Sequence, residues 1–223
     1  MPSPRILVCF AVKEEARPFV SNLRGSTTFN TLITGMGWKN AGEAIDRALV
    51  EFRPDLVLSC GFAGGLDPAH RPGAILFETD QPQLAERCSA LGAKSATFVC
   101  SPKVLSKAEE KLALRERSKA DAVEMESGII RRCCQERGVA SATIRVIIDP
   151  VEQDLPLDLE NVLTTRKRIS APKLACALLA SPSRIKSLID LRSDSIRVAK
   201  ELGAFLERLL APYDREHYGK GPV

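Results

Sequence analysis

The chain has 223 residues, of which 44% are hydrophobic and 27% are charged, and its formal net charge is +4. That length and composition predict one soluble domain with a sizeable core. The positive charges are mixed with negative ones, so no basic stripe favours nucleic acid as a partner. The sequence has no signal peptide and no apolar run of membrane-spanning length, so we expect a cytoplasmic protein without stable membrane insertion.

Strands and helices alternate along the first hundred residues. Short apolar runs predict strands, and apolar residues at helical spacing predict helices. The expected strands are Arg5 to Ala11, Asn30 to Thr34, Leu56 to Cys60, Ala74 to Glu78 and Ala96 to Cys100; the expected helices are Glu14 to Leu23, Gly42 to Phe52 and Pro82 to Leu91. This alternation predicts an α/β fold with three layers (α/β/α) and a mixed central sheet.

The stretch from Ala122 to Asp149 is the most informative part of the chain. Residues 127 to 138 have the spacing of an amphipathic helix, and residues 140 to 148 are rich in β-branched side chains, as in a strand buried on both faces. Asp149 therefore ends a buried strand, where α/β sheets bind their ligands. An Asp-Pro pair is also a common turn cap, so this position alone does not establish a site.

The remaining chain predicts an appendage to the same domain. Val151 to Ser170 is polar and loop-rich, and Ser183 to Leu210 has the pattern of a long amphipathic helix. We expect a single domain over residues 1–212, with helix 183–210 packed on it, and a flexible tail over residues 213–223.

Cysteine and glycine motifs exclude several kinds of site. The seven cysteines include no CxxC pair, which predicts reduced core residues in place of a disulfide framework. The motif from Gly35 to Gly37 lacks the third glycine of a dinucleotide fingerprint, and the run from Gly61 to Gly65 is not followed by the Lys-Ser or Lys-Thr of a phosphate-binding loop. We predict glycine turns that allow a ligand to approach the backbone, and we expect neither a cofactor nor a metal.

Several ordered motifs together carry a resemblance. They are Lys13-Glu14-Glu15, Gly35-Met36-Gly37, Gly61-Phe62-Ala63-Gly64-Gly65-Leu66, Val123-Glu124-Met125-Glu126 and Arg145 to Asp149. Over roughly Arg5 to Pro150 the chain resembles the nucleoside phosphorylase and nucleosidase superfamily, in particular the methylthioadenosine/S-adenosylhomocysteine nucleosidases. The short segment after Gly73 and the region beyond Asp149 look more like the hopanoid-associated phosphorylase branch.

The resemblance implies cleavage of the C1′–N9 bond of a purine nucleoside, in which positive charge develops on the ribose. Asp149 would be the general acid at N7 of the base, and Glu15 would orient and deprotonate a water molecule. Glu126 would accept hydrogen bonds from the ribose 2′ and 3′ hydroxyls. Without the resemblance, Glu15 is equally well explained as a solvated residue in the first turn of a helix.

Further substrate contacts are implied in the same way. Met125 would pack on the sugar, Ala63 and Gly64 would line the pocket, Phe98 and Val99 would contact the base, and Glu124 would be a secondary ligand or a structural residue. Phe98 is also explained as an ordinary core residue.

Phe62 stands where phosphorylases of this superfamily place the serine that binds phosphate. An aromatic ring would occupy part of that site without hydrogen-bonding an anion, so the sequence favours water as the nucleophile. An adenine nucleoside with a large 5′ substituent, such as adenosylhopane, fits the branch. The alternatives are a phosphorylase, a methylthioadenosine/S-adenosylhomocysteine nucleosidase, a pyrimidine or futalosine-type nucleosidase, and a catalytically weak nucleoside-binding scaffold. We expect a small-molecule nucleoside as the partner and a homo-oligomer as the assembly.

Overall fold

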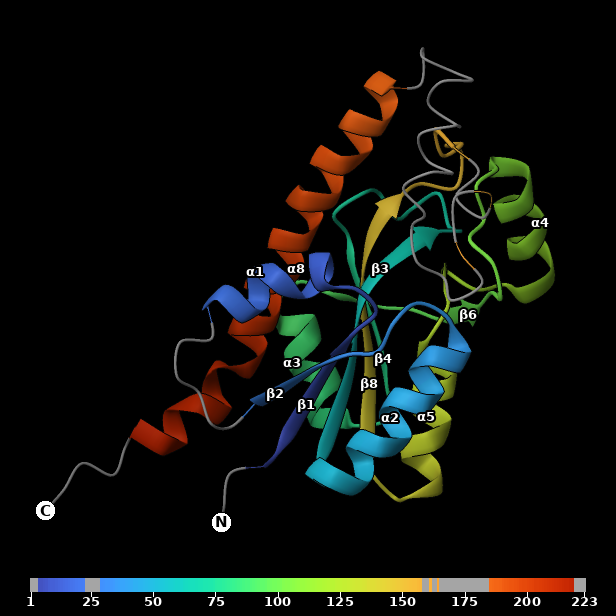
Figure 1. Ribbon diagram of the computed structural model, residues 1–223. Helices are drawn as coiled ribbons and strands as arrows, with labels where there is room; N and C mark the ends of the chain where they lie inside the picture. The colour runs from blue at the N-terminus through green and yellow to red at the C-terminus, as the bar shows by residue number, and fades with distance from the viewer. Residues whose placement is uncertain (1–3, 23–28, 158–160, 162–163, 165–184, 219–223) are drawn as a thin grey trace, which may run out of the picture.

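The computed structural model describes residues 4–22, 29–157, 161, 164 and 185–218 (Figure 1). The elements, in chain order, are β1 (Ile6–Phe10), α1 (Lys13–Asn22), β2 (Phe29–Ile33), α2 (Trp38–Phe52), β3 (Leu56–Gly65), β4 (Ile75–Thr79), α3 (Pro82–Ala90), β5 (Lys94–Ser95), β6 (Phe98–Cys100), α4 (Ala108–Ser118), β7 (Ala122–Glu124), α5 (Ser127–Glu136), β8 (Ala140–Asp149) and α8 (Ile185–Tyr218).

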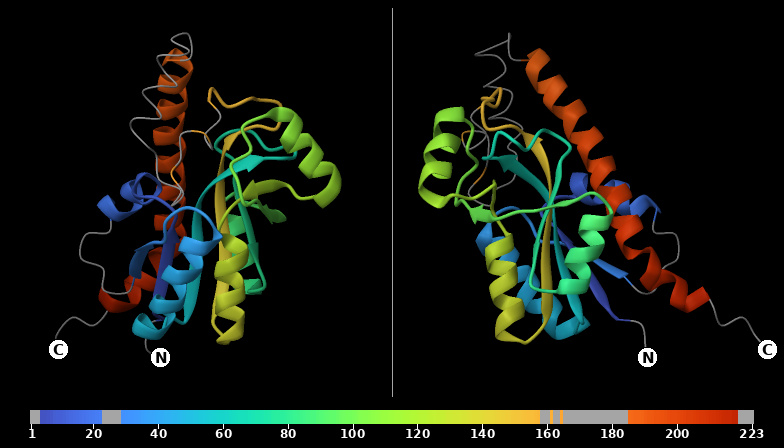
Figure 2. Two further views of the ribbon diagram at one scale, coloured as in Figure 1. Left: turned by 45° about the vertical axis from the view of Figure 1, so that its right-hand side comes forward. Right: turned by 180° about the vertical axis from the view of Figure 1, so that it is seen from behind.

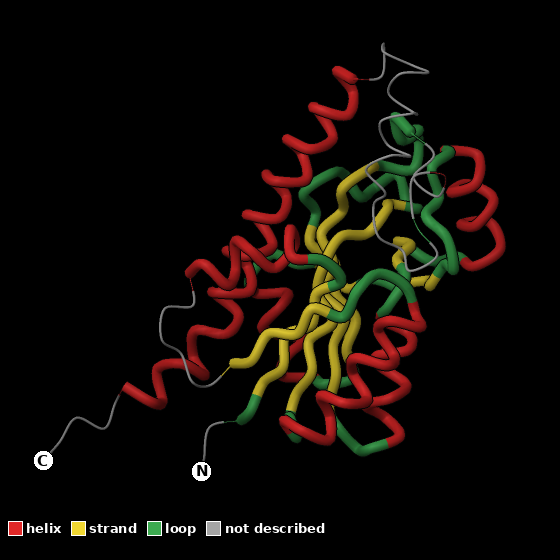
Figure 3. The backbone as a smooth tube through the Cα atoms, in the orientation of Figure 1, coloured by secondary structure: helices red, strands yellow, loops and turns green. Residues whose placement is uncertain are grey.

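The described strands form one eight-stranded sheet with the order β2-β1-β3-β8-β4-β5, and β7 joins β3 while β6 joins β7. Strands β1, β2, β3 and β8 run parallel, whereas β4 is antiparallel to β8 and β7 is antiparallel to β3. The sheet is therefore mixed, as predicted. Because β3 and β8 are neighbours, their carboxyl ends lie side by side at one edge of the sheet (Figure 3).

Helices cover both faces of this sheet, which confirms the predicted three layers (Figure 2). One apolar core lies between the sheet and helices α1, α3 and α8, and a second lies between the sheet and helices α2 and α5. Strand β1 shows why both layers are needed. Ile6, Val8 and Phe10 enter the first core, and Leu7 and Cys9 enter the second, so the strand is apolar at every position.

The glycine run after residue 60 is a strand and not the predicted turn. Strand β3 continues to Gly65 because β8 pairs with it on one side and β7 on the other, with a register shift between Ala63 and Gly64. The prediction was wrong because glycine has a low strand propensity, which pairing on both sides outweighs here. The backbone around Gly61 and Gly64 is thereby held in place.

The sequence patterns missed three elements, which are helix α4 and the short strands β5 and β7. Helix α4 buries Lys111 but leaves Leu112 48% exposed, so its apolar periodicity does not mark the inner face. Strand β7 has three residues, fewer than the pattern of a strand requires. Helix α2 begins at Trp38, four residues before the predicted start, because Gly37 is its N-cap.

The C-terminal helix is longer than predicted. Helix α8 packs against α1 and the sheet and runs to Tyr218, so residues 213–218, expected as tail, are helical. The predicted start at Ser183, and most of the polar segment from 151 to 170, lie outside the described residues. Within the described part of the chain, no helix combines the length and the hydropathy needed to cross a membrane.

Candidate active site

A buried arginine organises the carboxyl ends of the central strands. Arg145 on β8 is 1% exposed and lies opposite Gly61 of β3. Its Nη2 atom donates to Oε2 of Glu124 at 2.5 Å and to Oγ of Ser59 at 3.2 Å, and it lies 3.7 Å from Oε2 of Glu126. Burial opposes the positive charge, but Glu124, Glu126 and Glu15 outweigh it and raise the pKa of Arg145. One guanidinium thus lies among three carboxyl groups.

Glu124 is satisfied within the protein. Its Oε2 accepts hydrogen bonds from the backbone N–H groups of Glu126 (3.0 Å) and Ser127 (2.8 Å), and its Oε1 accepts from Oγ of Ser127 (2.8 Å) and Sγ of Cys100 (2.6 Å). Burial opposes ionisation, but Arg145 and these donors keep the pKa of Glu124 below its ordinary value. The carboxylate holds the first turn of α5, which fits the structural role considered for it.

The two carboxyl oxygens of Glu126 differ in their partners. Its Oε1 accepts the N–H of Gly37 at 2.8 Å, and Gly37 has φ +85°, a conformation that favours glycine. Among the described residues, the partner of Oε2 of Glu126 is the guanidinium of Arg145, at 3.7 Å. Burial raises the pKa of Glu126 to about 7; Arg145 opposes the rise and Glu124 adds to it. The carboxyl group is therefore poised to change charge near neutral pH.

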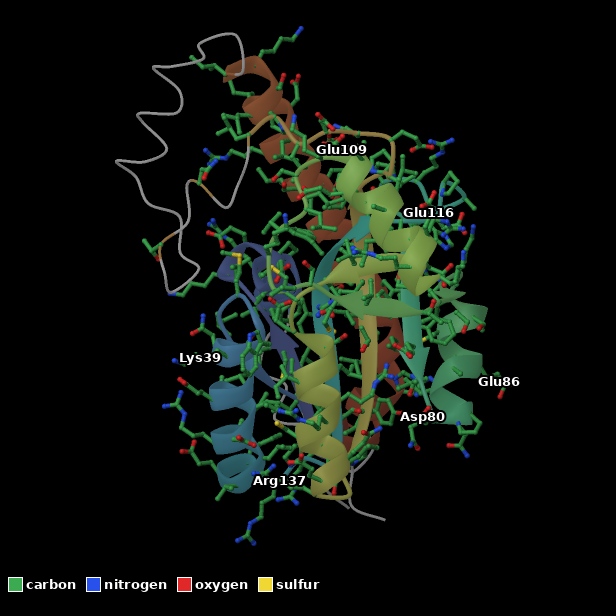
Figure 4. All side chains as sticks on the ribbon, turned by 90° about the vertical axis from the view of Figure 1, so that its right-hand side faces the viewer. Lys39, Asp80, Glu86, Glu109, Glu116 and Arg137 are labelled. Carbon is green, nitrogen blue, oxygen red and sulfur yellow. The ribbon has the colours of Figure 1, made fainter. Side chains whose placement is uncertain are left out.

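The raised pKa of Glu126 predicts a pH-dependent stability. Since the folded protein holds a proton that the unfolded chain releases, the free energy of unfolding falls as the pH rises from the ordinary glutamate value to about 7. Glu126→Gln should remove about 2 kcal/mol of the difference in unfolding free energy between pH 5 and pH 8, measured by urea denaturation. Glu116→Gln, on the exposed outer side of α4 (Figure 4), is the control and should leave that difference intact.

Glu15 is held by backbone groups near the same arginine. Its carboxylate accepts the N–H groups of Ala11 (3.0 Å), Val12 (3.2 Å) and Phe62 (2.9 Å). A Cβ atom at Gly61 would lie 2.7 Å from Oε1 of Glu15, so the close approach requires glycine there. Burial raises the pKa of Glu15, while the Phe62 N–H and Arg145 oppose the rise. At 5% exposure Glu15 is not a solvated first-turn residue.

Asp149 ends β8 beside a lysine that sequence analysis missed. The carboxylate is 5% exposed, and its Oδ2 accepts a hydrogen bond from Nζ of Lys111, which is fully buried on α4. Burial raises the pKa of Asp149, and Lys111 opposes the rise. The only signal in the sequence would have been a lysine on the inner face of α4, and that helix was itself not predicted.

The arginine cluster and Asp149 both lie along the strand pair β3 and β8. Arg145 and Asp149 are four residues apart on β8, and the register shift between β8 and β3 lies between them. On β3, Glu15 lies at Gly61 and Phe62, whereas Asp149 lies opposite Gly64. At the rise of a strand, that offset is about 7–10 Å. Two acidic groups are thus held apart on a rigid scaffold.

The other predicted site residues have mixed environments. Met125, which lies between Glu124 and Glu126 in the sequence, is half-buried. Ala63 is buried, and Gly64 is half-buried. Phe62 packs its ring against the core next to α1 and α8, while its backbone faces Glu15. Phe98 and Val99 pack in two small apolar clusters with Ala63 and Val123 respectively.

Cysteines are free wherever the structure describes them. Five are buried as predicted, but Cys100 is exposed, so its assignment to the core was wrong. Its Sγ atom donates to Oε1 of Glu124 and accepts the N–H of Gly128 at 3.2 Å. These hydrogen bonds hold the side chain of Cys100 in position. No group of His, Cys, Asp and Glu residues suited to a metal ion occurs within the described ranges.

Comparisons with known proteins bear on the family and the fold of the chain. A family model described as "Phosphorylase superfamily" matches residues 81–180. A 5′-methylthioadenosine/S-adenosylhomocysteine nucleosidase from Pseudoalteromonas translucida (strain TAC 125) is 25% identical over 197 residues, which cover 72% of this chain and 83% of that protein.

Solved structures of two Helicobacter pylori proteins share the fold. Futalosine hydrolase has a TM-score of 0.70 at 15% identity, with 94% of this chain and 98% of that chain covered. A 5′-methylthioadenosine/S-adenosyl homocysteine nucleosidase has a TM-score of 0.71 at 15% identity, with 95% of this chain and all (100%) of that chain covered. The arrangement of the sheet and its helices is therefore that of these structures.

Proposed function

Because the chain belongs to the nucleoside phosphorylase and nucleosidase superfamily, we propose that it hydrolyses the N-glycosidic bond of a purine nucleoside and releases the free base. The observation that carries this proposal is the cluster of three buried carboxyl groups, Glu15, Glu124 and Glu126, around the single guanidinium of Arg145. Nearby, Asp149 supplies a fourth carboxyl group on the same pair of strands.

The charge balance of this cluster suits a sugar that becomes cationic. As the C1′–N9 bond breaks, positive charge develops on the ribose, and fixed negative charges beside it stabilise the transition state. The carboxyl groups outnumber Arg145, so the cluster is acidic when they are ionised. Since backbone N–H groups already hold Glu15 and Glu126, little reorganisation is needed as the reaction proceeds.

The same balance supports water as the nucleophile. A phosphate ion would need a free cation, but the guanidinium of Arg145 is engaged by Glu124 and lies near Glu126. Like charges within about 4 Å repel strongly in a buried site. Phe62 supplies no hydroxyl at the position that would bind phosphate, since its ring packs against the core.

Each carboxyl group then has its own task. Glu15 orients a water molecule and takes its proton, and the water oxygen bonds to C1′ as the electron pair of the C1′–N9 bond leaves with the base. Asp149 delivers a proton to N7 of the purine. Glu126 accepts hydrogen bonds from the ribose hydroxyls through Oε2, with Met125 packed on the sugar, while Glu124 supports the loop that carries both.

The identity of the 5′ substituent is a finer part of the proposal. The short segment after Gly73 favours a large apolar group such as that of adenosylhopane. An exposed aromatic residue supports this preference, since Trp38 is 60% exposed and directly follows Gly37, whose N–H binds Glu126. We further propose that the protein acts as a homo-oligomer in the cytoplasm, with sedimentation velocity as the test of its assembly.

The test is release of free base from adenosine, methylthioadenosine and a long-chain 5′-alkyl adenosine, each with and without phosphate, with the sugar product identified. Free sugar formed without dependence on phosphate is the expected result, and faster cleavage of the long-chain nucleoside would support the apolar substituent. Ribose 1-phosphate would make the protein a phosphorylase, and no base release from any of them would favour the binding scaffold.

Glu15→Gln tests the proposed base. The amide keeps the size of the side chain but cannot take a proton from water, so hydrolysis should fall about 10²–10⁴-fold in kcat. Glu14→Gln, one residue earlier and exposed, makes the same chemical change and should keep wild-type turnover. Normal hydrolysis by Glu15→Gln would contradict the assigned role.

A further inference from the structure

Lys111 is a buried cation that the proposed reaction does not yet use. It is the buried residue of α4, whose exposed acidic residues Glu109 and Glu116 lie on the outer side of the helix (Figure 4). Leu112, the next residue, is 48% exposed. The helix thus turns a lysine inward and a leucine outward, the reverse of the arrangement that apolar burial favours.

Three acceptors surround the Lys111 side chain. Its Nζ atom donates to Oδ2 of Asp149, to the carbonyl oxygen of Pro150 at 2.8 Å and to the carbonyl oxygen of Gln153 at 2.9 Å. An ammonium group has three N–H donors, which matches this set. The lysine therefore joins α4 to the end of β8 and to the segment that follows.

The same geometry also accommodates the neutral form of the pair. A neutral amine has two N–H donors for the two carbonyl oxygens and one lone pair, which can accept the O–H of a protonated Asp149. A proton can therefore move between Nζ and Oδ2 without the loss of a hydrogen bond. Burial favours the neutral form of the pair, because that form avoids the desolvation cost of two charges.

Other charges around the pair are few. Asp154 is an exposed residue in the segment after β8, and Lys111 is among the groups that lower the pKa of Asp154. On the Asp149 side, the neighbouring positions on β3 and β7 are Gly64 and Val123, which carry no charge. In the described part of the chain, Lys111 is thus the charged group that faces Asp149.

We propose that Lys111 is a positioning residue for the general acid: it holds the transferable proton beside Asp149, so that the two side chains act as one acid. The inference rests on the proposed function. One proton passes from Nζ of Lys111 to Oδ2 of Asp149, and the carboxyl group delivers that proton to N7 of the purine, which leaves a neutral amine beside an ionised carboxylate. The base leaves with the C1′–N9 electron pair, water bonds to C1′, and Glu15 takes the proton of that water. Glu15 then releases a proton to solvent and the pair regains one.

The pH profile of kcat/KM in Lys111→Met tests this role. With lysine present, the pair keeps one proton into the alkaline range, whereas a lone buried carboxyl group loses it nearer neutral pH. In Lys111→Met we expect the alkaline limb of the kcat/KM profile to shift to lower pH by at least about one pH unit. Lys107→Met, which removes an exposed lysine just before α4 that is paired with Asp154, should keep the wild-type limb. A uniform loss of activity without movement of the limb would show a merely structural role and overturn the inference.

A second measurement does not depend on turnover. The ¹³C resonance of the Asp149 carboxyl group, followed between about pH 5 and pH 9, should stay constant in the wild type and titrate in Lys111→Met. Titration of the wild-type carboxyl group within that range would overturn the inference even if Lys111→Met does not fold. If the wild type releases no base from any purine nucleoside, the proposed function fails, while the resonance still decides whether the pair keeps its proton.

Discussion

Asp149→Asn is expected to lower kcat about 10²–10⁴-fold while the nucleoside still binds, because the amide keeps the shape of the side chain but cannot deliver a proton to the departing base. Turnover is measured as release of free base, and binding as heat of association with the intact nucleoside. Asp80→Asn changes an exposed aspartate (Figure 4) and should leave both quantities unchanged. Wild-type turnover in Asp149→Asn would remove Asp149 from the mechanism.

The folding of Asp149→Asn needs its own check. The substitution leaves the buried Lys111 without a negative partner, so the free energy of unfolding should fall as well. A thermal melt separates this effect from the loss of the acid, because a folded variant that binds nucleoside but does not cleave it isolates the chemical step. The double variant Asp149→Asn with Lys111→Met should recover stability but not turnover.

Arg145→Met is expected to produce the largest loss of stability, about 3–5 kcal/mol in the free energy of unfolding. It leaves the carboxyl groups of Glu15, Glu124 and Glu126 buried without their shared cation. The measurement is urea denaturation at pH 8 and at pH 5. Since the unpaired carboxyl groups can take up protons at the lower pH, the loss should be smaller at pH 5.

The matched control is Arg131→Met. Arg131 is partly exposed on α5 and pairs with Glu78, so its removal should cost less than about 1 kcal/mol. Glu124→Gln added to Arg145→Met should restore part of the stability, because it removes one of the unpaired charges. Equal losses in the two arginine variants would mean that Arg145 does not neutralise the carboxyl cluster.

Local patterns in the sequence determined most of the regular elements. The strand at β1 was predicted because it is a continuous apolar run, and the helix at α5 was predicted because its apolar side chains recur at helical spacing. Asp149 was singled out because it ends a buried strand, and such strands end at one edge of an α/β sheet, whereas Glu15 was singled out by the resemblance. These inferences depend on neighbours in the chain, so the sequence alone is sufficient for them.

Only the tertiary structure decided which groups face one another. Lys111 reaches Asp149 across 38 residues, and Gly37 reaches Glu126 across 89. The glycine run became a strand through its partners β7 and β8, and Lys111 is buried because the end of β8 supplies its acceptors. The physical reason is common to all of them: hydrogen bonds and ion pairs in a buried site outweigh local propensity, and they form between residues that only the fold brings together.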